Sequence, residues 1–522
     1  MVAVETREAV EGLARGDDRR LGRGLDIALG VAIFAVGFGV YSARWIDLFP
    51  LDEFRSWLFL PRGSVSDLAR HVALVQDQKY ATYAGRGVSM FLVKASANAC
   101  DLNTRCLNAT QLFVIAGSGV LLYSLLLRLT RRRGIAALAG LLWLFSVPVL
   151  DSISWQATIN DKLAALFTLA GLNIGLSFFR RTLTTRAIAV GNVVLLAAVA
   201  LAYNSKESAW VLVPSLALLA VATRERLDWH AVGRAGAVLV LPAAYAVYHF
   251  VLYTRNTEAD AVWGGHIHDG NPWDNVKAYV RILANGQSAS DRRVLPVIVA
   301  VAIVVLIISI AAAATAMLTR RGWNSSSDLA RFALWSIASL AIAIAIPLRT
   351  QFHDGYYMVV PALFLFVALG VGAAMVADAR ARQTLRLASV VVAVAVVVVL
   401  GVNFRRSYDD GYAPIPHESA NFTTAIRQAG RVVPRQLRQP VVLVTADETT
   451  NAYHFTGTGT WRDISEYMFD TRTPNRGFEK HFVDMKRSAF DASPRDPTAY
   501  YVVFDDAMRL ERVDHGATVV YP

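Results

Sequence analysis

Long apolar runs alternate with polar segments from residue 25 to residue 402 of this chain. A helix needs roughly 17 to 25 mostly apolar residues to cross a bilayer, so the pattern predicts about eleven transmembrane helices. The predicted spans are 25–41, 107–127, 135–150, 162–179, 187–203, 208–222, 232–253, 294–318, 331–347, 356–377 and 386–402.

The composition agrees with a membrane protein. Hydrophobic residues make up 54% of the 522 residues and charged residues 18%, whereas a soluble domain has about 25% charged residues. The first apolar run lacks a small-residue cleavage site after it, which favours a retained signal anchor. We therefore predict a polytopic α-helical membrane protein in which the lipid bilayer is itself a partner.

Arginines predict the orientation of the chain. The formal net charge is +11, but the basic residues are dispersed among the predicted membrane loops, so we expect topology signals and no nucleic-acid partner. Basic clusters precede the first span and follow every second span thereafter, which places the N-terminus in the cytoplasm. The expected location is a bacterial-type inner (plasma) membrane.

With this orientation, two long loops, 42–106 and 254–293, lie outside the cytoplasm. We predict a transmembrane domain over residues 1–402, with these two external loops, and an extracytoplasmic soluble α/β domain over residues 403–522. Within the second domain, "VVLVTAD" (441–447) and "AYYVVFDD" (499–506) are typical of buried strands, and 418–433 is typical of an amphipathic helix.

The two cysteines, Cys100 and Cys106, fall in one predicted external loop. They can form a small disulfide or remain two free thiols, and they are too few for a zinc site. His266 and His268 in "GGHIHDG" are also too few ligands for a metal. We predict no cofactor, and the sequence leaves a divalent metal open.

Ionisable residues gather at those ends of the predicted helices that face outside. Charge near a bilayer is costly and usually marks function. Local alternatives exist, since an acidic pair can stabilise a helix N-terminus and a lysine can snorkel to the interface. The residues are Asp52, Glu53, Asp161, Lys162, Lys206, Glu207, Arg349, His353, Asp354, Tyr356 and Tyr357.

At these positions the sequence resembles the GT-C superfamily of membrane glycosyltransferases, which includes protein O-mannosyltransferases and the aminoarabinose transferases of lipid A. The matching elements, in order, are Asp52-Glu53, "YAGRG" (83–87) with Arg86, Asp161, "SKE" (205–207) followed by an apolar run to Pro214, and "HDGYYMVVP" (353–361). The resemblance covers about residues 25–380. Family members often have Arg-Tyr where this chain has Gly355-Tyr356, so the basic role would pass to Arg349 or His353. A DxD metal motif is not recognisable.

The resemblance implies inverting transfer of a sugar from a polyprenyl-phosphate carrier to an unknown extracytoplasmic acceptor. Asp52 is then the expected catalytic base, with Glu53 and Asp161 as further catalytic candidates. Lys206, Arg349, His353 and Arg86 would bind the donor phosphate with Tyr356 beside them, and Glu207 would hold Lys206 in place. Alternatives are a transporter or lipid flippase, an O-antigen ligase or polymerase, and a structural scaffold.

Overall fold

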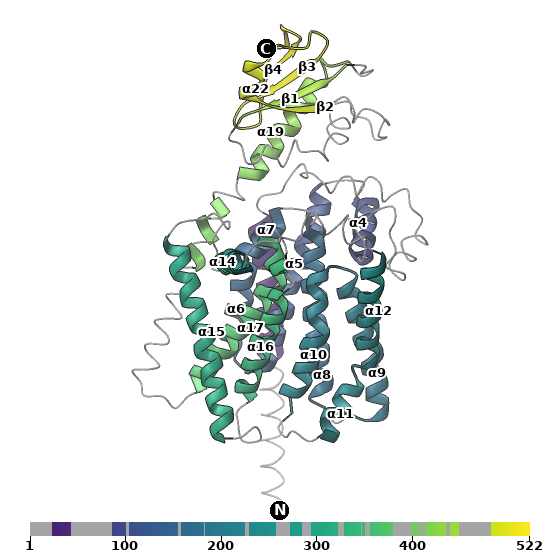
Figure 1. Cartoon of the computed structure of the whole chain (residues 1–522), viewed down its shortest axis with the longest axis vertical. Coiled ribbons are helices and arrows are strands. Elements are labelled where there is room, and N and C mark those ends of the chain that lie inside the picture. Colours follow the sequence, from purple (N-terminus) through teal and green to yellow (C-terminus); the bar gives the residue numbers. More distant parts are fainter. Residues whose placement is uncertain are drawn as a thin grey trace, which may run out of the picture.

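The computed structural model describes residues 23–42, 86–100, 104–154, 158–181, 183–224, 229–256, 272–283, 294–321, 328–345, 347–349, 355–378, 398, 400–402, 404–406, 408–409, 414–434, 439–447 and 482–521. A bundle of long helices forms most of the molecule, and a small β-sheet near the C-terminus lies beyond one end of the bundle (Figure 1).

The bundle opens with a helix over Arg23–Ser42. The helices that follow are α4 (Gly87–Cys100), α5 (Thr104–Thr130), α6 (Arg133–Leu144), α7 (Val147–Ser154), α8 (Ile159–Phe179), α9 (Thr185–Tyr203), α10 (Leu212–Ala222), α11 (Trp229–Ala237), α12 (Val240–Asn256), α14 (Pro272–Leu283), α15 (Val294–Arg321), α16 (Asp328–Ala345) and α17 (Val359–Asp378). Three short 3-10 helices are η4 (Glu207–Val211), η6 (Pro347–Arg349) and η7 (Gly355–Met358).

Within the described residues, 6 helices are long and apolar enough to cross a membrane, and a bent helix pair can supply one more span. Each predicted span from 25–41 to 356–377 overlaps a helix of the bundle. The last predicted span, 386–402, lies mostly outside the described residues. The helical membrane class is therefore confirmed, whereas the total of eleven spans stays a prediction.

The predicted continuous span 135–150 is wrong in detail, because α6 and α7 are separate helices that meet at a bend of 48°. Pro148 lies in the first turn of α7 and has no N–H to donate to the carbonyl of Leu144, four residues earlier. That carbonyl instead accepts a hydrogen bond from the buried Tyr41 hydroxyl at 2.7 Å. The first helix thus stabilises the break through a side chain.

The predicted span 232–253 is also broken, between α11 and α12. The Asn192 amide on α9 bonds to both sides of this break. Its Nδ2 donates to the carbonyl of Ala237 at 2.6 Å, and its Oδ1 accepts from the N–H of Leu241 at 2.9 Å. In an unbroken helix the N–H of Leu241 would donate to the carbonyl of Ala237, four residues earlier. At the break, the side chain of Asn192 pairs with both groups instead.

Helix α17 forms the centre of the bundle. Its sequence, VVPALFLFVALGVGAAMVAD, is apolar on every side, as expected for a helix enclosed by other helices. It packs against α5, α6, α8, α15 and α16. Trp143 on α6 is fully buried against it, and its indole N–H donates to the carbonyl of Val359 at 3.3 Å.

The C-terminal sheet has five strands in the order β2-β1-β3-β4-β5. The strands are β1 (Val441–Thr445), β2 (Phe482–Lys486), β3 (Tyr500–Phe504), β4 (Leu510–His515) and β5 (Thr518–Tyr521). Strands β2, β1 and β3 run parallel, and β4 and β5 add antiparallel at one edge. The two predicted strands correspond to β1 and β3, and the β4–β5 hairpin was not foreseen.

Helices cover both faces of this sheet. Helix α19 (Pro414–Ala429) packs Phe422 and Ile426 against one face, and α22 (Arg487–Ala492) places Phe490 on the other. The β4–β5 turn contains Gly516 at φ 57°, where a Cβ atom would lie 3.0 Å from the backbone of Pro497. Glycine is suited to this turn because it alone adopts positive φ without steric cost.

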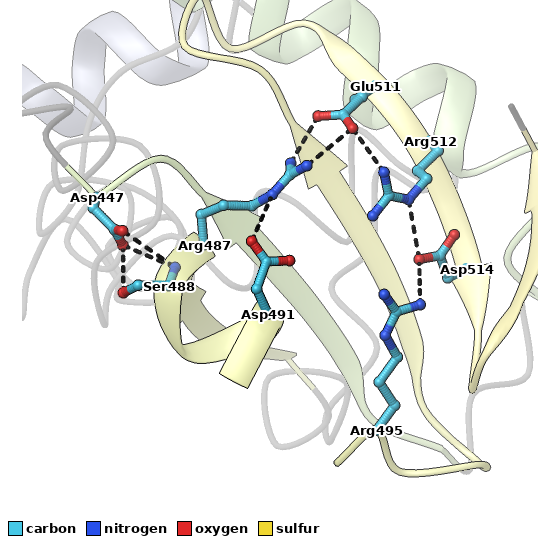
Figure 2. Close-up of polar contacts among 8 residues, drawn as sticks. All are labelled: Asp447, Arg487, Ser488, Asp491, Arg495, Glu511, Arg512 and Asp514. Carbon is cyan, nitrogen blue, oxygen red and sulfur yellow. Dashed lines mark hydrogen bonds and ion pairs between the residues drawn. The ribbon is translucent and has the colours of Figure 1, made fainter. Parts of the chain in front are cut away.

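A chain of alternating charges crosses the α22 face of the sheet (Figure 2). Arg487 and Arg512 both contact Glu511 at 2.7 Å. Asp514 is fully buried, and its Oδ2 accepts hydrogen bonds from Arg495 at 3.0 Å and from Arg512 at 3.2 Å. The arginines are partly exposed, so the buried Asp514 carboxylate is the member of this network whose loss should matter most.

Asp514→Asn should therefore loosen the C-terminal sheet. It removes the charge that two arginines share, and loss of a charge-assisted hydrogen bond at a buried group costs about 1–3 kcal/mol. Hydrogen exchange of the β4 amides in the intact protein should accelerate accordingly. Asp506→Asn, at an exposed position, is the control. It should change the opening free energy derived from the exchange rates by less than about 0.5 kcal/mol. Unchanged β4 protection in Asp514→Asn would contradict this view of the network.

The disulfide alternative is confirmed at Cys106, which is disulfide-bonded in the structure. Cys100 is the one other cysteine of the sequence. Cys106 lies in the first turn of α5 and Cys100 at the last residue of α4. A disulfide here suits an oxidising compartment, and the external position of this loop stays a prediction.

Candidate active site

Four segments far apart in the sequence meet at one end of the bundle. Arg86 precedes α4, Asp161 lies in the first turn of α8, Lys206 and Glu207 follow α9, and η7 precedes α17. Because α8 and α9 are consecutive antiparallel helices, the start of one and the end of the other lie at the same end of the bundle. Figure 1 shows α4 and α7 at the end that faces the C-terminal sheet.

The first charged pair is Lys206 with Asp161. The Lys206 ammonium donates to Asp161 Oδ2 at 2.6 Å. Both are buried, with side-chain exposures of 8% and 1%. The ammonium also lies 4.7 Å from the centre of the Tyr357 ring in η7, a cation–π distance. Asp161 and Tyr357 thus hold the cation from two different helices.

The second pair is Arg86 with Glu207. Nη2 of Arg86 lies 3.2 Å from each oxygen of the Glu207 carboxylate, and Nε lies 3.4 Å from Oε1. The Tyr253 hydroxyl on α12 donates to the same Oε1 at 2.9 Å. Burial acts to lower the pKa of Arg86, but Glu207 and other nearby groups outweigh it, so this pKa lies above its ordinary value. Arg86 is a permanent cation.

Backbone contacts fix the segment that carries both Lys206 and Glu207. At the start of α4, the N–H of Val88 donates to the carbonyl of Asn204 at 3.0 Å, and the Ser89 hydroxyl donates to the carbonyl of Ser205 at 3.2 Å. Lys206 itself has extended backbone angles, φ −163° and ψ 156°. Successive side chains along extended backbone project in opposite directions, which lets Lys206 and Glu207 contact different partners.

The structure brings together four of the residues singled out from the sequence, namely Arg86, Asp161, Lys206 and Glu207. The carboxylate of Glu207 bonds to Arg86 and Tyr253, and the ammonium of Lys206 bonds to Asp161. The expectation that Glu207 holds Lys206 in place stays a prediction.

The other candidate residues are placed less fully. Arg349 is the last residue of η6 and Tyr356 lies in η7, so their backbones belong to the short segment between α16 and α17. Asp52, Glu53 and His353 lie outside the described residues. Their roles stay predictions.

Two aromatic residues of the site were not among the predicted site residues. Tyr357 directly follows the predicted site residue Tyr356 in "HDGYY", and its ring contacts the Lys206 ammonium. Tyr253 was counted as part of an apolar span. The available signal was the run "YAVYHFVLY" (245–253), in which three tyrosines and a histidine interrupt a membrane segment.

Within the part of the chain that the structure describes, no group of three or more His, Cys, Asp or Glu side chains is arranged to hold a metal ion. His266 and His268 lie outside that part. The two cation–carboxylate pairs are instead suited to bind an anion that competes with the carboxylates, because phosphate forms strong charge-assisted bonds to lysine and arginine.

Comparison with known proteins finds that the chain is similar to several solved structures. No family model and no curated protein matches the chain. Among solved structures, the chain is similar to ArnT from Cupriavidus metallidurans in the apo state, at 15% identity and a TM-score of 0.42 over 94% of each chain. The same protein bound to undecaprenyl phosphate matches at 14% identity and a TM-score of 0.42, over 92% of this chain and 93% of that one.

The chain is also similar to the archaeal oligosaccharyltransferase AglB from Archaeoglobus fulgidus, in complex with an inhibitory peptide and a dolichol-phosphate. That match has 12% identity and a TM-score of 0.41, and it covers 86% of this chain and 64% of that one. At such identities and TM-scores, these likenesses assign no role to any residue of this chain.

Proposed function

We propose that this chain is a multi-pass membrane glycosyltransferase that moves a sugar from a polyprenyl-phosphate carrier to a hydroxyl group of an extracytoplasmic acceptor. The observation that carries the proposal is two ion pairs at one end of a helical membrane bundle, the buried pair Lys206–Asp161 and the part-buried pair Arg86–Glu207. Two cations at this end of the bundle could neutralise the negative charge of a lipid carrier's phosphate.

Lys206 and Arg86 are the proposed phosphate ligands. Arginine can bind a phosphate through two parallel N–H groups, and lysine acts as a point charge. Both would stabilise the negative charge that develops as the phosphate leaves the sugar. Arg349, His353 and Tyr356 are proposed to complete this set from the segment before α17.

Asp161 and Glu207 balance the charges of the two cations. An arriving phosphate would compete with Asp161 for Lys206, and the released carboxylate could then orient the acceptor hydroxyl. Glu207 is held from a second side by the Tyr253 hydroxyl, so it is better suited to keep Arg86 in place than to take part in proton transfer.

The proposed reaction is one inverting displacement. The acceptor oxygen forms a bond to the anomeric carbon, the bond from that carbon to the phosphate oxygen breaks, and the bonding electron pair leaves with the phosphate. Asp52 takes the proton of the acceptor hydroxyl, and Glu53 is the neighbouring alternative. The residues proposed here require no cofactor, and a divalent metal is left to experiment.

The placement of charge favours an enzyme over a transporter. A transporter binds its substrate near the middle of the membrane, at broken helices. Here the two ion pairs, one buried and one part-buried, lie at helix ends, where a lipid phosphate at headgroup depth could meet them. The orientation of that end toward the outside of the cytoplasm is part of the proposal.

The experiment is mass spectrometry of lipid-linked sugars and envelope glycans from cells with and without the gene. Without it, one polyprenyl-phosphate sugar should accumulate and one glycan modification should disappear. The purified protein should then transfer that sugar in liposomes, assayed with and without a chelator. Unchanged lipid-linked sugars and glycans would reject the proposal. Movement of the lipid across liposomes with no consumption of the sugar donor would indicate a flippase.

A further inference from the structure

His249 on α12 is an unusual buried residue. Its side chain is 1% exposed, and neither ring nitrogen has a hydrogen-bond partner in the described structure. Four aromatic rings surround it, with ring centres 5.6 Å away for Tyr203, 6.4 Å for Trp210, 6.0 Å for Tyr245 and 6.3 Å for Tyr253. Three helices contribute to this enclosure, namely α9, η4 and α12.

Burying polar nitrogens without partners is unfavourable, because they lose their hydrogen bonds to water. A phenylalanine would fill an aromatic enclosure without that cost. An imidazole with both nitrogens unpaired therefore requires a physical explanation, and the angles between the rings supply one. His249 meets Tyr203 at 79° and Trp210 at 75°, so ring edges face ring surfaces, whereas it lies nearly parallel to Tyr253 at 15°.

The polar edge of an imidazole is attracted to the electron-rich face of an aromatic ring. A phenyl ring has no such polar edge, so it would be oriented less firmly in the same space. The imidazole orientation in turn determines where the parallel Tyr253 ring lies. Tyr253 is four residues further along α12, and it also packs against Trp210 at 5.2 Å and 87°.

From Tyr253 a short chain of contacts leads to the proposed phosphate site. The Tyr253 hydroxyl donates to Glu207 Oε1 at 2.9 Å, and the Glu207 carboxylate accepts from Arg86 at 3.2 Å. We propose that His249 is a positioning residue that acts through Tyr253 and Glu207 to set the guanidinium of Arg86. The inference rests on the proposed function in one respect, that Arg86 binds the donor phosphate.

The test is a double-mutant cycle with undecaprenyl phosphate as the binding probe. His249→Phe keeps a ring in the enclosure but removes the polar edge, and Tyr253→Phe removes the hydroxyl that holds Glu207. Each should weaken probe binding about 3- to 10-fold, the range expected for one hydrogen bond. The double variant should bind no more weakly than Tyr253→Phe alone, because His249 acts through that hydroxyl.

Kinetics give a second readout in the transferase assay. The kcat/KM for the sugar donor should fall in His249→Phe by at least the factor seen in probe binding, because Arg86 is proposed to contact the phosphate both on binding and as it leaves. Val247→Ala, an exposed position on the same helix, is the matched control and should leave probe binding and kcat/KM unchanged. Thermal unfolding in detergent checks that each variant is folded.

Two failures can be told apart. If Arg86→Met binds the probe as tightly as the wild type, the proposed phosphate role of Arg86 is wrong, and the positioning role with it. If Arg86→Met loses the probe while the losses from His249→Phe and Tyr253→Phe add in the double variant, only the positioning role is overturned. Wild-type binding by His249→Phe would also overturn it.

Discussion

Lys206→Met should reduce sugar transfer by about 10²- to 10³-fold, the loss typical when one group that stabilises developing negative charge is removed. The substitution keeps the length of the side chain but not the ammonium that lies 2.6 Å from Asp161. It should also weaken binding of the lipid phosphate donor, because the cation is proposed to contact the phosphate before and during the reaction. Donor titrations and single-turnover rates in liposomes measure the two effects separately.

The same substitution leaves Asp161 buried without its cation. Removing one partner of a buried pair typically costs about 3–5 kcal/mol of stability, so lost activity alone would be ambiguous. The double variant Asp161→Asn/Lys206→Met removes both charges and should regain most of the thermal stability. Its transfer rate should remain low, because the phosphate still lacks its cation. Recovery of transfer together with stability would show that Lys206 is only structural.

Asp52→Asn should lower transfer by roughly 10²- to 10⁴-fold, the usual contribution of a general base. Asparagine has nearly the size of aspartate and keeps hydrogen bonding, but it cannot accept the proton of the acceptor hydroxyl. Binding of undecaprenyl phosphate should change little, since Lys206 and Arg86 rather than Asp52 are proposed to hold the phosphate. Transfer rate and probe binding, measured on the same preparation, test both statements.

This substitution also separates catalysis from helix capping. Asparagine caps a helix about as well as aspartate, so a purely capping Asp52 would tolerate the change. Near-normal transfer by well-folded Asp52→Asn protein would reject Asp52 as the base and direct attention to Glu53 or Asp161. Glu53→Gln in the otherwise wild-type protein is the matched comparison, because it removes the charge of the neighbouring carboxylate and leaves Asp52 in place.

Much of the fold follows from local sequence pattern. A run such as VVPALFLFVALGVGAAMVAD predicts a membrane helix because its length and apolarity are properties of one segment. The breaks were not predictable in the same way. Pro148 signals a weakness, but the bend also depends on Tyr41, a residue from another helix whose hydroxyl satisfies the carbonyl of Leu144. Asn192 plays the corresponding role for α11 and α12.

The candidate site likewise has a part that the local sequence predicts and a part that depends on the tertiary structure. The sequence by itself determined that this is a helical membrane protein and that Asp161, Lys206 and Glu207 stand at helix ends, because hydropathy and charge are local along the chain. Only the tertiary structure decided which charges pair. Lys206 meets Asp161 across a separation of 45 residues and Arg86 meets Glu207 across 121. The extended backbone at Lys206 sends adjacent side chains to opposite sides, so neighbours in sequence have different partners in space.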